Sequence, residues 1–266
     1  MSLLWIALAV AICAQRLWVF IACWQPDVQL WERTLLSFTL PNIITAVVVL
    51  LLGVLAARAS RTDLEVERKL SGTGVALLMG GAFCFLLTGV GYGALRFVIQ
   101  AQVQVSDLLV SVALLALAFL STALAPALRR DSRNGAVAGL SMFGCLAILL
   151  LLVCSYVGRT EMAVLEQYMY YLLLLCAGAL AALALSKAML RGTSLRSARY
   201  YLWLTLYCAA GELLPAGVLE KQQGQGWLPL ILYGGMLAAI LLMALGIEMS
   251  VREEQIFLEE PESIEE

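Results

Sequence analysis

Long apolar segments alternate with short polar ones along most of this chain. A bilayer core of about 30 Å requires about 20 apolar residues per helix, and each apolar segment is long enough to meet that requirement. The polar breaks predict eight membrane spans, approximately Leu3 to Trp24, Leu35 to Ala57, Gly72 to Val98, Leu108 to Leu128, Ala136 to Val157, Tyr168 to Leu190, Tyr200 to Leu219 and Leu228 to Met249. The predicted fold class is an all-α, polytopic membrane helix bundle with eight transmembrane helices.

The distribution of Lys and Arg predicts the orientation of these spans, because cytoplasmic loops retain positive charge. Alternate loops and the segment after the last span hold twelve basic residues: Arg58, Arg61, Arg68, Lys69, Arg129, Arg130, Arg133, Lys187, Arg191, Arg196, Arg199 and Arg252. The intervening loops hold only four: Arg33, Arg96, Arg159 and Lys221. We therefore expect both termini in the cytoplasm. We also expect the first apolar segment to be retained as a helix rather than cleaved as a signal peptide, since no basic residue precedes it.

Aromatic residues near the span ends agree with this arrangement, because amphipathic rings favour the headgroup level. The expected outer belt consists of Trp24, Trp31, Tyr168, Tyr170, Tyr171 and Trp227. The expected inner belt consists of Tyr200, Tyr201 and Trp203.

Composition narrows the class of protein further. Hydrophobic residues make up 62% of the 266 positions and charged residues 14%, which excludes an ordinary soluble or disordered chain. The net charge of -2 gives no basic surface for nucleic acid. The chain has no His, the commonest general base and catalytic zinc ligand. Its seven Cys show no metal-binding spacing, so we expect no cofactor and no metal.

The last fifteen residues differ sharply from the rest of the chain. Seven of its nineteen acidic residues lie there, and residues 1–251 carry 16 basic and 12 acidic residues. We therefore divide the chain into a membrane-embedded bundle, 1–251, and an acidic cytoplasmic tail, 252–266. The tail is either a solvated helical extension of the last span that ends near Pro261, or a docking segment for a basic partner protein. Membrane lipids are the other expected partners.

Two ionisable residues lie deep inside predicted spans, where such residues are costly and therefore suggest a functional site. Arg16 lies about thirteen residues into the first span and Glu212 about twelve residues into the seventh. Both spans rise from the cytoplasm, so a rise of 1.5 Å per residue places both side chains about 18–20 Å from the inner boundary. We expect them at matching depths, slightly to the outer side of the midplane.

Other polar groups are predicted near the same level. Gln15 adjoins Arg16, and Asn42 follows Pro41 about a third of the way along the second span. Pro215 has no backbone N–H, so it leaves a carbonyl free one turn earlier, near Gly211. Gln15, Arg16, Asn42 and Glu212 are therefore the candidate residues of a polar pocket open to the outer side. The alternatives are an Arg16–Glu212 ion pair that only locks two helices together, or a catalytic site.

The third span contains Val90-Gly91-Tyr92-Gly93, the tetrapeptide of potassium-channel selectivity filters. In those channels the peptide is an extended loop. Here the tetrapeptide lies inside a full-length apolar segment, and loops of opposite charge character flank that segment. We predict that Gly89 and Gly93, spaced for close helix contact, pack against a neighbouring helix instead.

One segment suggests a family. Between Leu150 and Gly178 the chain contains Cys154-Ser155-Tyr156, Gly158-Arg159 and Leu165-Glu166-Gln167-Tyr168-Met169-Tyr170-Tyr171, followed by an Arg-rich loop. This resembles a group of uncharacterised eight-span bacterial integral membrane proteins. The resemblance covers about half of the chain and implies the same number of spans, but no activity, ligand or catalytic residue.

These observations favour a membrane-embedded binding, sensor or partner subunit of the plasma (inner) membrane, with an outward-side polar pocket. The alternative is a small secondary transporter or permease subunit that uses Glu212. An intramembrane lipid-modifying enzyme is a third interpretation, although no second carboxylate, thiol or metal ligand is placed near Glu212.

Overall fold

The computed structural model describes residues 2–22, 24–25, 30–31, 39–61, 70–95, 97, 105–129, 135–157, 162–191, 195–221 and 227–258. These residues form eight α-helices: α1 (Ser2–Ala22), α2 (Leu40–Arg61), α3 (Gly72–Ala94), α4 (Val105–Arg129), α5 (Gly135–Val157), α6 (Met162–Arg191), α7 (Arg196–Glu220) and α8 (Leu228–Leu258). Two short strands, β1 (Trp24–Gln25) and β2 (Leu30–Trp31), pair antiparallel between α1 and α2, with Trp24 opposite Trp31.

Six of the eight helices are long and apolar enough to cross a membrane: α2, α3, α4, α5, α6 and α8. α1 is 21 residues long, and its apolar stretch among the residues whose side chains the structure describes is Leu3–Val19. α7 is 25 residues long, yet it is not among the six. The prediction of an all-α, multi-pass membrane bundle is thus confirmed, with six helices that qualify as spans by length and composition.

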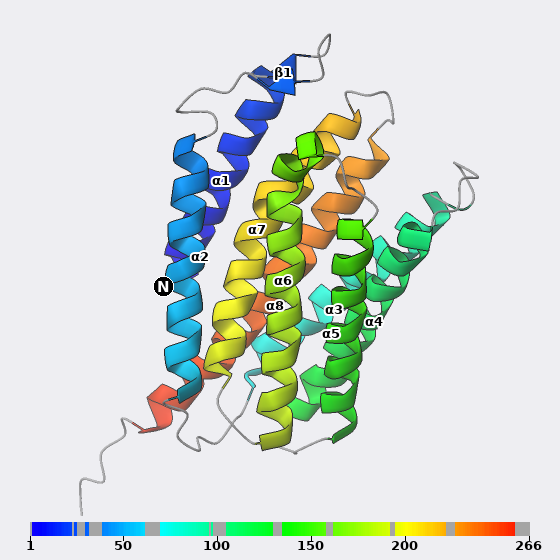
Figure 1. Ribbon diagram of the computed structural model, residues 1–266. Coiled ribbons are helices and arrows are strands. Elements are labelled where there is room, and N and C mark those ends of the chain that lie inside the picture. Colours follow the sequence, from blue (N-terminus) through cyan, green and yellow to red (C-terminus); the bar gives the residue numbers. More distant parts are fainter. Residues whose placement is uncertain are drawn as a thin grey trace, which may run out of the picture.

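The helices from α3 to α8 form a closed ring in which each packs on the next in sequence, and α8 packs back on α3. The remaining two helices, α1 and α2, pack on α7 (Figure 1). α7 therefore contacts four helices, and every residue from Leu202 to Gly211 on it is buried. Because α7 faces protein rather than lipid over this stretch, it can carry more polar residues than the other helices do.

Glycines allow α3 to lie close to both of its neighbours. A Cβ on Gly89 would lie 3.1 Å from Leu114 Cβ, and one on Gly93 would lie 3.3 Å from Ser111 Oγ, both on α4. On the α8 side, a Cβ on Gly74 would lie 3.1 Å from the carbonyl oxygen of Gly246. The prediction that Gly89 and Gly93 serve close packing is confirmed. The tetrapeptide that they flank and overlap is helical, without the extended loop of a filter.

α8 is longer than its apolar segment. The apolar part ends at Met249, but the helix continues to Leu258, across the boundary at residue 251 that the sequence suggests. At 1.5 Å per residue its 31 residues extend over about 46 Å, against a bilayer core of about 30 Å. The first part of the acidic tail is therefore a helical extension of α8. Residues 259–266 lie outside the described part of the chain.

Candidate functional site

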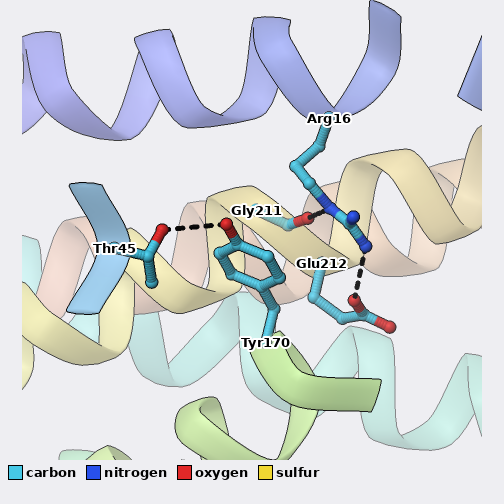
Figure 2. Close-up of polar contacts among 5 residues, drawn as sticks. All are labelled: Arg16, Thr45, Tyr170, Gly211 and Glu212. Atoms are coloured by element: carbon cyan, nitrogen blue, oxygen red, sulfur yellow. Dashed lines mark hydrogen bonds and ion pairs between the residues drawn. The ribbon is translucent and has the colours of Figure 1, made fainter. Parts of the chain in front are cut away.

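The candidate site gathers around one face of α7. Tyr207 and Gly211 are four residues apart, so they lie one above the other on this helix, and Glu212 adjoins them. Arg16 approaches from α1, Thr45 from α2 and Tyr170 from α6 (Figure 2). We call these six residues, Arg16, Thr45, Tyr170, Tyr207, Gly211 and Glu212, the polar cluster.

Arg16 and Glu212 form an ion pair inside the bundle. The distance from Arg16 Nη2 to Glu212 Oε2 is 4.0 Å, and the two side chains are only 7% and 12% exposed. The sequence predicts that these two residues lie at matching depths, and the structure shows that they also meet. Each charge deep in a membrane costs about 2.5–3.5 kcal/mol on insertion scales, and a nearby opposite charge offsets part of that cost.

A backbone carbonyl provides a second contact for Arg16. Arg16 Nε donates a hydrogen bond of 3.3 Å to the carbonyl oxygen of Gly211. In a regular helix this oxygen accepts from the N–H four residues later, which here is Pro215, and proline has no N–H. Pro215 lies inside α7, and the helix continues through it without a break. The carbonyl that the sequence predicts to be free is therefore used by the guanidinium.

Gly211 also makes room for the ring of Tyr170. A Cβ at position 211 would lie 2.9 Å from Tyr170 Cδ1, closer than real Cβ contacts allow. The Tyr170 ring therefore rests against the α7 backbone. The Arg16 guanidinium carbon lies 4.7 Å from the centre of this ring, within the range of a cation–π interaction. One glycine thus lets an aromatic ring and a cation stack beside the same helix.

Three hydroxyl groups form a short chain next to the ion pair. Thr45 Oγ1 lies 2.8 Å from the Tyr170 hydroxyl oxygen and 3.0 Å from that of Tyr207. All three residues are buried. A threonine hydroxyl has one donor and two acceptor positions, so Thr45 can bond to both tyrosines at once. In this way α2 is tied to both α6 and α7.

The four residues predicted to line a pocket do not all lie together in the structure. Arg16 and Glu212 come together, whereas Gln15 and Asn42 are half-buried on α1 and α2. Asn42 lies in the first turn of α2, which begins at Leu40. The α2 residue in the polar cluster is Thr45, three positions later, which sequence reasoning missed.

Two residues expected in the aromatic belts lie in the interior instead. Tyr170 and Trp203 are each only 1% exposed, so these two predictions are wrong. Tyr170 turns its hydroxyl to Thr45, and Trp203 Nε1 donates a hydrogen bond of 2.9 Å to Glu248 Oε2 on α8. An interfacial tyrosine and a buried one look alike in sequence, because both follow a polar loop and precede an apolar segment.

Glu248 is a second buried carboxylate, which sequence reasoning missed. It is 8% exposed and lies near the end of the apolar part of α8, where a charged residue is ordinary. Its partner Trp203 lies on α7, seven residues after the helix begins at Arg196. The same central helix is thus tied by polar contacts to α1 and α2 through the polar cluster and to α8 through Glu248.

The recorded contacts of the polar cluster join helices to one another. A guanidinium keeps its proton in proteins, so Arg16 is not a proton donor or acceptor for catalysis. Glu212 is its counter-ion, and the Tyr170 and Tyr207 hydroxyls both bond to Thr45. Within the described part of the chain, no group of three or more His, Cys, Asp or Glu residues is placed to hold a metal ion.

Comparisons with known proteins found no matching family model, no matching curated protein and no matching solved structure. The resemblance to uncharacterised eight-span bacterial membrane proteins therefore stays a prediction.

Proposed function

We propose that this protein is a membrane-embedded partner or sensor subunit of the bacterial plasma membrane, with both termini and the acidic tail in the cytoplasm. The observation that carries the proposal is the continuity of α8 from its apolar segment into residues 250–258. A continuous helix transmits a shift or rotation of its membrane part to its cytoplasmic end. The acidic charge beyond Met249 suits a basic surface on a cytoplasmic protein.

The burial of the polar cluster inside the bundle supports this assignment. Arg16 and Glu212 are largely buried and contact each other, which favours a contact that holds α1 on α7 over an open ligand site. In the proposed function the polar cluster sets the position of α7, and α7 is tied to α8 through Trp203 and Glu248.

Cross-linking in native membranes tests the proposal. A photo-activated residue at position 256 of the full chain should give a discrete cross-linked product with a cytoplasmic protein. That product should disappear when the seven Glu residues of the tail are replaced by Gln at unchanged length, because the attraction is electrostatic. Equal cross-linking by the neutral tail, or no product from the native tail, would contradict the proposal.

The alternative is a small secondary transporter that uses Glu212, and one observation favours it: a buried ionisable residue of the central helix α7 pairs with an opposite charge on α1, and ionisable residues within spans often mark transport sites. In purified protein in vesicles, proton- or sodium-dependent uptake that Glu212→Gln abolishes without loss of assembly would establish this alternative. The unbroken course of α7 through Pro215 differs from the interrupted helices of many transporter sites.

A further inference from the structure

The apolarity of α7 does not match its place in the bundle. It is the helix on which α1, α2, α6 and α8 all pack, yet over its full length it is the least apolar of the eight described helices. It carries Glu212 at the seventeenth of its 25 residues and has two Arg in its first turn, Arg196 and Arg199. A helix with this composition partitions poorly into lipid unless neighbouring helices satisfy its polar groups.

α1 has the same difficulty, because it carries a buried residue of the opposite charge to Glu212, Arg16. Its apolar segment, which runs from Leu3 to Trp24 in the sequence, is long enough for a span but is interrupted by Arg16. The structure resolves both difficulties with one set of contacts. The guanidinium pairs with Glu212, donates to the carbonyl of Gly211 and lies over the Tyr170 ring.

The two helices are made at different times. Arg16 and Gly211 are separated by 195 positions, so at about 5–20 residues per second α7 emerges roughly 10–40 s after α1. During this interval Arg16 has none of its contacts with α7. The contacts that hold α1 in the bundle are therefore incomplete until α7 has been synthesised.

We propose that α1 and α7 are the seventh and eighth membrane spans of this protein and that they are stably held in the membrane only as a pair. Arg16 is the counter-charge that keeps α7 across the membrane. The Gly211 carbonyl of α7, which Pro215 leaves free, and the Tyr170 ring of α6, which rests against Gly211, together form the binding site for Arg16. In this sense the N-terminal helix completes the insertion of a helix near the other end of the chain.

Thiol labelling tests the pairing. A cysteine at position 224, between α7 and α8, is introduced into the full chain after its seven native cysteines are replaced, and a membrane-impermeant maleimide reports its compartment. Arg16→Leu makes α1 more apolar, so α1 itself should insert at least as well as before. The fraction of chains with residue 224 in its wild-type compartment should nevertheless fall about threefold or more, because Glu212 loses its counter-charge.

The double variant Arg16→Leu with Glu212→Leu separates this effect from general misfolding. It removes both charges and should restore the wild-type compartment for residue 224. Gly246→Val, which disturbs packing between α3 and α8 without touching a charge, should leave the compartment unchanged even if the protein becomes less stable. Wild-type labelling in Arg16→Leu would overturn the proposal, as would failure of the double variant to restore it.

Discussion

Where α1, α2 and α6 meet around α7, the contacts are a charge pair, a cation over an aromatic ring and hydrogen-bonded hydroxyls. Where α3 meets α8, glycines let two backbones approach: a Cβ on Gly246 would lie 3.0 Å from Leu78 Cγ and 3.1 Å from the carbonyl oxygen of Gly74. Both are contacts within one bundle, and each brings together parts of the chain that are far apart in sequence.

The two contacts differ in what they specify. In lipid, apolar helices gain little from burying apolar surface against each other, so shape and polar groups decide which helices associate. The glycine contact depends on shape and tolerates no added bulk. The polar cluster depends on which side chains are present. Its members form hydrogen bonds and an ion pair with one another, so replacing one of them leaves a buried polar group without its contact. Substitutions should therefore fail in different ways at the two places.

Removing one charge of the ion pair should have the largest effect. Arg16→Met leaves Glu212 as a buried charge without its counter-ion, so we expect the free energy of unfolding in detergent to fall by about 3–5 kcal/mol. Glu212→Leu in the same chain should recover most of the loss, since neither charge is then left alone. Unfolding by a denaturing detergent, followed by tryptophan fluorescence, measures both variants. Additive losses in the double variant would show that the two residues do not depend on each other.

Adding bulk to the glycine contact should have the next largest effect. Gly246→Val places methyl groups against the α3 backbone, which cannot give way, and overpacking of this kind costs about 1–3 kcal/mol. Gly139→Val on α5 is the matched control, because a Cβ there meets nothing within 4 Å. The same unfolding measurement should show a loss for Gly246→Val and little change for Gly139→Val. A second substitution that removes a charged side chain from α8 should not restore the free energy of unfolding that Gly246→Val loses.

The parts of the fold that face lipid were predictable from sequence. α2 is the least buried of the six qualifying helices, and its long apolar stretch identifies it as a span. The buried ionisable residues of α1 and α7 were equally predictable, because a charge in an apolar segment is conspicuous and its depth follows from counting residues. Even the free carbonyl at Gly211 followed from the position of Pro215.

The hydroxyl groups and Glu248 were not predictable, for two physical reasons. Thr45, Tyr170 and Tyr207 carry no charge, so nothing in sequence separates them from residues that face lipid or headgroups. Their roles depend on which helices are neighbours, and α6 reaches the polar cluster only because it packs beside α7. Glu248 lies at the end of an apolar segment, where a charge is usual, and its burial comes from Trp203 on another helix.

The hydroxyl chain offers the smallest and sharpest test of the polar cluster. Tyr170→Phe and Tyr207→Phe each remove one hydrogen bond to Thr45 and leave the ring in place, so each should lower the free energy of unfolding by about 0.6 kcal/mol and by no more than about 1.7 kcal/mol. Thr45→Val removes both bonds at once with little change of volume. If Thr45 is the shared partner, combining Thr45→Val with either tyrosine variant should cost less than the sum of the two single losses. Full additivity would mean that the tyrosine hydroxyls find other partners, and that α2 is held on α7 by its apolar contacts alone.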